Sequence, residues 1–308
     1  MSGLKTRIQD LEKLLVLCFA TFLVMTGQGV VGPVVPLYAR DFGVSASVVG
    51  LTLTVFALAR LILNVPAGLI ADRFGRRVLL IGGPILTSIG MFGSGFANSI
   101  ESLLVWRFVA GAGSAFYMSG ALIYLIDIAP SDRRARYVAT NQWALSVGVA
   151  LGPGVGGLIA ERWGLASPFH VVGIVGIATA IYAAFRLPET KGSQDSIPKD
   201  SDTKSEVTKI IRSGPFLAIA FVTGTIFMTR AGTRATLVPL QADEALGWGP
   251  GQIGLIFTVT GIMTLFTLWP AAWATENISR GSVILFSGVA AGIGTFVISF
   301  SAAPLWFV

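Results

Sequence analysis

The chain has 308 residues, of which 53% are hydrophobic and only 12% are charged, and its mean hydropathy is +0.75. Soluble domains carry about 25% charged residues, so this composition excludes an ordinary soluble protein and indicates a polytopic membrane protein. The net charge of +6 does not indicate a nucleic-acid-binding protein, because the basic residues lie in short segments between apolar runs. Cys18 is the only cysteine, which excludes an intramolecular disulfide and a cysteine-based metal site.

Apolar runs follow one another along the chain. A membrane-spanning helix needs about 20 such residues. We predict helices over 14–38, 46–71, 78–97, 101–127, 136–160, 168–187, 213–240, 249–274 and 281–303, with a tenth beginning at Pro304. The polar stretch 188–212 is rich in Ser, Asp, Lys and Pro, as flexible linkers are. The predicted organisation is a six-helix bundle over 1–187, a cytoplasmic linker over 188–212 and a partial second bundle over 213–308.

The basic residues lie almost entirely on one side of the predicted spans. The turns on the other side carry only Arg40 and Arg162. Cytoplasmic loops of membrane proteins are enriched in Lys and Arg. We therefore predict a multi-pass protein of the plasma (inner) membrane whose N-terminus and 188–212 linker are cytoplasmic.

The second predicted bundle repeats landmarks of the first. Gly43 matches Gly247 and Pro66 matches Pro270, each 204 positions further along the chain. Parallel repeats of this kind are typical of transporters, whose substrate site lies between the two halves near the middle of the membrane.

Four local patterns in the first half point to one family. They are Gly68-x-x-x-Asp72-Arg73-x-Gly75-Arg76-Arg77, Arg107-x-x-x-Gly111-x-Gly113, Asp127-x-x-Pro130-x-x-x-Arg134 and Gly148-x-x-x-Gly152-Pro153-x-x-Gly156-Gly157. Together they resemble the major facilitator superfamily, and within it the drug:proton antiporter-like exporters. The resemblance implies an all-α membrane protein with the major facilitator fold, here a six-helix N-terminal bundle plus a partial C-terminal bundle. That family usually has twelve helices, so we expect the sequence to be C-terminally incomplete.

The resemblance also implies a function. We expect a transporter, not an enzyme, that moves a small organic solute by alternating access, with proton-coupled efflux of drugs or metabolites as the favoured mode. It implies a monomer in the lipid bilayer, protons as the coupling ion and no cofactor. Two alternatives remain open: a carrier for metabolite uptake or facilitated diffusion, and a truncated membrane subunit that does not transport.

A cytoplasmic gate follows from the first and third patterns. By the resemblance it contains Gly68, Asp72, Arg73, Gly75, Arg76, Arg77, Asp127 and Arg134. Asp72, Arg76 and Asp127 would form a charged latch across the two halves. A carboxylate near a helix C-terminus is unfavourable by about 0.3–1 kcal/mol unless it is paired, so Asp72 is expected to lie near an arginine. The alternative is that the turn only anchors the protein through its positive charge.

A packing motif follows from the fourth pattern. Gly148, Gly152 and Gly156 recur every four residues and form a stripe without side chains, where another helix can approach closely. Pro153 favours a bend, and Gly157 extends the motif. Static packing and a role in conformational switching both fit this pattern.

Polar residues inside the spans suggest a substrate cavity. The candidates are Gln28, Arg60, Asn64, Arg107, Arg230 and Arg234. A buried arginine normally faces a cavity or a partner, so these side chains favour an anionic substrate; pairing with carbonyls or with acids beyond Val308 is the alternative. The predicted spans contain no carboxylate near mid-membrane and no metal-binding cluster. The proton carrier would then be Asp127 or an acid in further helices. The remaining alternative is that transport is coupled in another way.

Overall fold

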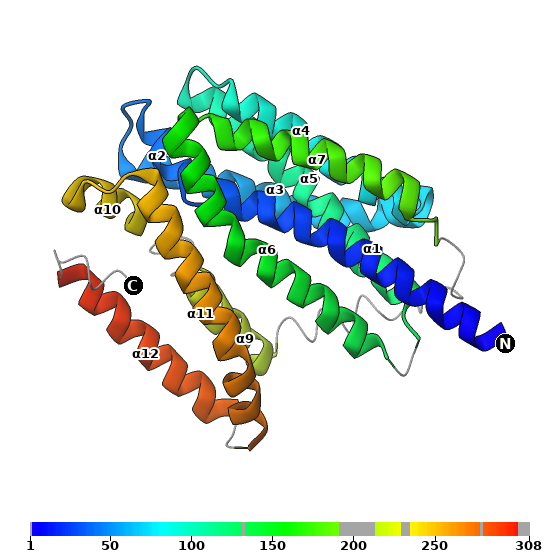
Figure 1. Cartoon of the computed structure of the whole chain (residues 1–308). Coiled ribbons are helices and arrows are strands. Elements are labelled where there is room, and N and C mark those ends of the chain that lie inside the picture. The colour runs from blue at the N-terminus through cyan, green and yellow to red at the C-terminus, as the bar shows by residue number, and fades with distance from the viewer. Residues whose placement is uncertain (1, 131–132, 191–212, 229–234, 278–279, 301–308) are drawn as a thin grey trace.

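The computed structural model describes the chain except residues 1, 131–132, 191–212, 229–234, 278–279 and 301–308 (Figure 1). Every regular element in the described part is a helix. The helices are α1 (Ser2–Val31), α2 (Val34–Arg40), α3 (Ala46–Phe74), α4 (Arg76–Gly95), α5 (Ile100–Ile128), α6 (Arg134–Trp163), α7 (Ser167–Arg186), α9 (Gly214–Met228), α10 (Val238–Leu246), α11 (Pro250–Asn277) and α12 (Arg280–Phe300). Among the described residues, seven segments are long and apolar enough to cross a membrane. These findings confirm an all-α polytopic membrane protein.

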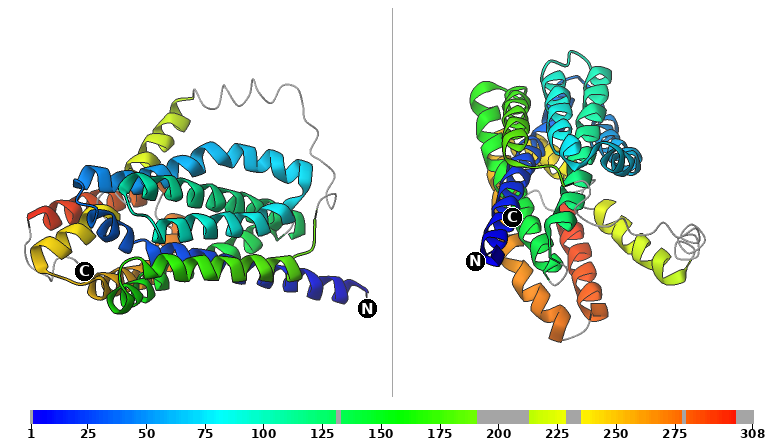
Figure 2. Two further views of the ribbon diagram at one scale, coloured as in Figure 1. Left: turned by 90° about the horizontal axis from the view of Figure 1, so that it is seen from above. Right: turned by 90° about the vertical axis from the view of Figure 1, so that its right-hand side faces the viewer.

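Helices α1 to α7 form the N-terminal half. Within it α4 packs against α5 and α7, α3 packs against α5, and α1 packs against α6 and α7 (Figures 1 and 2). The interior contains small residues and a few large ones, such as Leu17, Tyr117 and Tyr124. The outside exposes rows of large apolar side chains, for example Leu61, Val65 and Leu69 on α3. Exposed apolar rows are expected of a surface that faces lipid rather than water.

The first predicted helix, 14–38, is wrong as a single element. The structure breaks it at Gly32 and Pro33, so that α1 ends at Val31 and α2 begins at Val34. Pro33 has no N–H to continue the hydrogen bonding of α1. The other described spans begin or end within a few residues of their predicted limits. The prediction of one helix over 213–240 falls partly outside the described residues, and α10 continues past its predicted end to Leu246.

The repeat has a structural counterpart at the ends of α2 and α10. These helices begin at Val34 and Val238, and each is followed by a glycine with a left-handed backbone, Gly43 (φ 73°) and Gly247 (φ 63°). A residue with a Cβ rarely adopts such angles. Each half therefore reaches its next helix through a turn that contains a glycine with positive φ.

The two halves meet near one end of the molecule. We call this the far end; it carries the turns 41–45, 164–166 and 247–249. The basic end is the opposite one and carries the turn 75–77, the start of α6 and the end of α7. Helix α10 contacts α2, and α11 packs along α6. Figure 1 shows α6 and α11 separating from one another away from this contact.

Candidate gates and cavity residues

An ion pair between Arg76 and Asp127 is the centre of the basic end. Arg76, in the first turn of α4, places Nε 2.8 Å from Oδ2 of Asp127 near the end of α5. Their side chains are 17% and 9% exposed. The hydroxyl of Thr190 donates a second hydrogen bond to the same oxygen, at 2.9 Å. A carboxylate near the negative end of a helix needs such partners, so this pair locks α4 to α5.

Asp72 is only loosely attached to this pair. Its Oδ1 lies 3.9 Å from Nη1 of Arg76, which also donates to the carbonyl of Ala71 at 3.2 Å. The Asp72 side chain is 64% exposed, and the guanidinium of Arg73 lies 5.3 Å from the ring centroid of Phe74. The structure therefore places the Arg76–Asp127 pair inside the N-terminal half, where it does not bridge the halves, and leaves Asp72 facing outward.

Glu189 is a member of this network that sequence reasoning missed. Its carboxylate accepts hydrogen bonds from the backbone N–H groups of Arg76, at 2.9 Å, and Arg77, at 3.2 Å. Anions are favoured at this positive end of a helix. Gly75 has φ 98°, and a Cβ there would lie 2.6 Å from Cδ of Glu189. Gly75 therefore has two roles: its backbone adopts the positive φ that the turn requires, and its lack of a Cβ leaves space for the Glu189 carboxylate.

The remaining predicted gate residues have simpler surroundings. Arg77 donates a hydrogen bond from Nη2 to the carbonyl of Ala184, which ties α4 to the end of α7. Arg134 is exposed at the first position of α6. A Cβ added at Gly68 would meet open space, so packing in this structure does not require a glycine there.

The predicted cavity residues fall into two groups. The amide of Gln28 donates to Oγ of Ser114 at 2.7 Å, and Asn64 accepts from Ser119 at 3.3 Å, so both are tied to α5. The two described arginines, Arg107 and Arg60, form the second group.

Arg107 and Arg60 lie inside the N-terminal half without a carboxylate partner among the described residues. Arg107 is 4% exposed, its guanidinium lies 4.6 Å from the ring centroid of Phe56, and its Nε has no described hydrogen-bond acceptor. Arg60 is half-buried. Arg230 and Arg234 lie outside the described residues.

Helix α6 has two glycine faces that contact different halves. Gly148, Gly152 and Gly156 face α1; a Cβ at Gly152 would lie 2.6 Å from Cα of Gly29. Gly157 faces α11, where a Cβ would lie 3.0 Å from Cα of Gly254. The predicted stripe thus serves packing within one half, and the contact between the halves uses the neighbouring face.

Pro153 and Thr258 lie at the centre of the α6–α11 contact. Pro153, inside α6, has no N–H, which leaves the carbonyl of Val149 without its intrahelical donor. The next residue, Gly154, donates its backbone N–H to Oγ1 of Thr258 on α11 at 2.7 Å. This hydrogen bond joins the two halves directly.

A second ion pair joins the halves at the far end. Arg40, the last residue of α2, pairs with Glu244 of α10. Behind the pair, Leu37, Ala242 and Ile253 form a buried apolar cluster with contributions from both halves. Burial, and secondly the charge of Asp243, raise the pKa of Asp41 beside this pair. Sequence reasoning counted Arg40 only as a rare basic residue on this side.

Apolar spans, two repeated halves and charged contacts at both ends define the class of polytopic transporters. The chain belongs to the Major Facilitator Superfamily, whose family model matches residues 17–308. This confirms the resemblance found in the sequence. The chain therefore has the major facilitator fold and belongs to a family of membrane transporters rather than of enzymes.

Relatives in archaea and bacteria match most of the chain. An uncharacterised MFS-type transporter of Methanocaldococcus jannaschii is 26% identical over 299 residues, which cover 94% of this chain and 73% of that protein. The Quinolone resistance protein NorA of Staphylococcus aureus is 31% identical over 261 residues, covering 84% of this chain. The chain spans 66% of the length of NorA.

Solved structures show the same fold. A bacterial homologue of the human lysosomal transporter Spinster, in an inward-facing and unoccupied conformation, aligns with a TM-score of 0.72 at 19% identity, over 88% of this chain and 64% of that one. A D-xylose–proton symporter aligns with a TM-score of 0.63 at 17% identity, over 86% and 69% of the two chains.

Proposed function

We propose that this chain moves a small organic solute across the plasma membrane by alternating access, as a proton-driven exporter of drugs or metabolites. The observation that carries the proposal is that the described contacts between the halves lie toward one end. The Arg40–Glu244 pair and the α6–α11 contact hold the far end together. The match to a protein named for quinolone resistance supports the export direction.

Opening of the far end would break these contacts while the basic end closes. We propose that the N-terminus and the basic end are cytoplasmic, as the Lys and Arg distribution favours. Asp72, which is exposed beside Arg76 in this conformation, would then meet the C-terminal half. The Arg76–Asp127 pair would act as the rigid base that positions Asp72, because both its residues lie in the N-terminal half.

We propose that the substrate is anionic. Arg60 and Arg107 place two positive charges inside the N-terminal half, and among the described residues no carboxylate forms an ion pair with either. Arginines within a membrane mark substrate or ion pathways. We also propose that the transporter works as a monomer, as the resemblance to its family implies.

Proton coupling would act through a carboxylate. The described acidic residues lie at the ends of the candidate membrane spans or outside them, and among the ion-paired carboxylates Asp127 has the least exposed side chain. We propose Asp127, or an acid in further helices, as the carboxylate through which a proton drives transport.

Flux into everted vesicles tests this function. Anionic and cationic dyes are compared under an imposed pH gradient, with and without a protonophore. The proposal predicts uptake of anionic dyes that the protonophore abolishes. Equilibration that does not depend on the gradient would establish a facilitator instead, and absence of flux from folded protein would favour a subunit that does not transport.

A further inference from the structure

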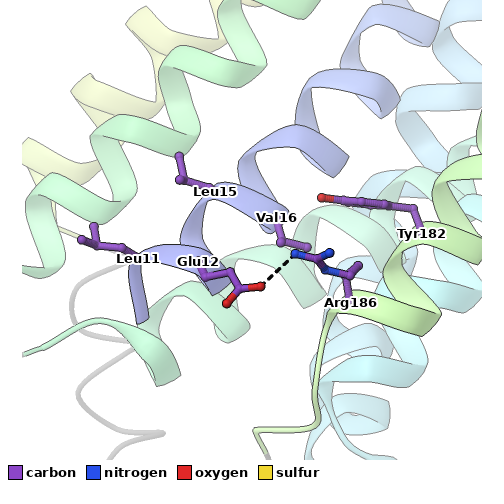
Figure 3. Close-up of a pocket in the computed structure, with 6 residues that line it drawn as sticks. All are labelled: Leu11, Glu12, Leu15, Val16, Tyr182 and Arg186. Carbon is purple, nitrogen blue, oxygen red and sulfur yellow. Dashed lines mark hydrogen bonds and ion pairs between the residues drawn. The ribbon is translucent and has the colours of Figure 1, made fainter. Parts of the chain in front are cut away.

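A groove of about 510 Å³ lies between α1 and α7, outside the contact between the halves (Figure 3). Its lining residues are Leu11, Glu12, Leu15, Val16, Tyr182 and Arg186. It lies at the basic end, next to the start of the candidate span Leu11–Arg40 and the end of the candidate span Ser167–Arg186. Helix α7 packs against α1 and α4, whereas α11 packs against α6. The groove is therefore separate from the interface at which transport is proposed.

One charge of each sign lies at the mouth of the groove. Oε1 of Glu12 is 2.8 Å from Nη2 of Arg186, and Figure 3 shows the two side chains reaching toward one another from α1 and α7. The side chains are 59% and 53% exposed. A carboxylate accepts about four hydrogen bonds and a guanidinium donates five, so each group keeps free capacity for another partner.

The walls below this pair are apolar and face outward. Leu11, Leu15 and Phe19 follow one another at every fourth position of α1, and all three are exposed. The ring of Tyr182 packs edge-on against Phe19, with centroids 5.4 Å apart. Tyrosine is favoured at the level of lipid headgroups. The ion pair suits the charged headgroup of a phospholipid, and the exposed apolar row that begins there suits its acyl chain.

We propose that this groove binds a phospholipid with a primary ammonium headgroup, such as phosphatidylethanolamine. Its phosphate lies against Arg186, its ammonium against Glu12, and one acyl chain runs along Leu15 and Phe19. The pair is neutral overall, so it complements a zwitterion better than an anion. A primary ammonium donates hydrogen bonds to a carboxylate, whereas a quaternary choline has none to donate.

Binding is tested with three lipids that share the same palmitoyl and oleoyl chains. Native mass spectrometry of the detergent-solubilised transporter measures retention of the phosphatidylethanolamine, phosphatidylcholine and phosphatidylglycerol forms. We expect phosphatidylethanolamine to bind about threefold to fivefold more tightly than the other two, as one charge-assisted hydrogen bond at an exposed site allows. Equal retention of all three lipids, or a preference for phosphatidylglycerol, overturns the proposal.

Two variants locate the site. Glu12→Gln should bring phosphatidylethanolamine binding to within about twofold of phosphatidylcholine, because the ammonium loses its anionic partner. Arg186→Gln should weaken retention of both lipids. The control is Glu101→Gln, which changes an exposed carboxylate in the first turn of α5. This variant should leave the preference for phosphatidylethanolamine intact. A preference that survives Glu12→Gln, in protein whose melting temperature is unchanged, contradicts the assignment. The test involves no transport, so its failure leaves the proposed function standing.

Discussion

The ion pair inside the N-terminal half differs in burial from the ion pair that joins the halves. Inside the half, the Arg76 and Asp127 side chains are 17% and 9% exposed, and the glycine stripe of α6 lies against the backbone of α1. Between the halves, the Arg40 and Glu244 side chains are 41% and 51% exposed. Exposed ion pairs contribute little stability. The buried pair is suited to persist and the exposed pair to break, as the rocking of one half against the other that we propose for transport would require.

Removing the buried carboxylate should cost the most stability. Asp127→Ala leaves Arg76 in a half-buried position without its partner and should lower the free energy of unfolding by about 2–3 kcal/mol. Asp72→Ala removes the loose, exposed partner of the same arginine and is expected to cost less than about 0.5 kcal/mol. Unfolding in detergent micelles measures both. Equal losses from the two variants would contradict the inner role of Asp127.

Close packing of α6 on α1 predicts the next largest effect. In Gly152→Ala the new Cβ would lie 2.6 Å from Cα of Gly29, and relief of such a clash costs about 1–3 kcal/mol. The matched control is Gly68→Ala in α3, where a Cβ meets open space; it should be neutral or stabilising by up to about 1 kcal/mol. Thermal unfolding measures the stability of both variants. A Gly152→Ala variant as stable as Gly68→Ala would show that the contact between α6 and α1 tolerates a side chain.

The carboxylate at the start of α4 should contribute less. Glu189→Gln keeps acceptors for the N–H groups of Arg76 and Arg77 but removes the charge, which should cost about 0.5–1 kcal/mol. Salt should reduce the difference between the variant and the parent, because the interaction of a charge with a helix end is screened. A loss that is the same at low and high salt would show that this charge does not act on the helix end.

A shift with pH at the far end is the smallest effect we predict. Burial and Asp243 raise the pKa of Asp41, so the closed far end takes up a proton more readily than an opened one. Closure should therefore become more favourable as the pH falls toward this raised pKa. Spin-label distances between α2 and α10 measure closure across a pH series. Asp243→Asn removes one cause of the raised pKa, and a pH response of undiminished size in that variant would refute this account.

The sequence predicted the spans, the family and the charged turn because these depend on local composition and spacing. Apolar length identified the helices, and the repeat placed Gly43 and Gly247 in equivalent turns, where both have positive φ. The break at Gly32 and Pro33 was missed, although the proline was visible, because a hydropathy pattern runs through it unchanged.

Contacts between distant segments could not be predicted in the same way. Glu189 lies in a polar stretch that resembles a linker, and only the fold brings its carboxylate to the start of α4. The Arg40–Glu244 pair joins residues about two hundred positions apart. The Arg76–Asp127 pair was expected to belong to a latch across the halves, and its location within one half follows from the packing of α4 on α5.

Cross-linking of the far end tests the central claim most directly. Arg40→Cys and Glu244→Cys are combined with Cys18→Ser, which removes the only native cysteine. The account predicts that a disulfide forms, that flux in everted vesicles stops, and that a reductant restores it. The matched controls are the two single variants Arg40→Cys and Glu244→Cys, each with Cys18→Ser, which cannot form this cross-link and whose flux should not respond to oxidant or reductant. Undiminished flux through a transporter cross-linked between positions 40 and 244 would contradict the account.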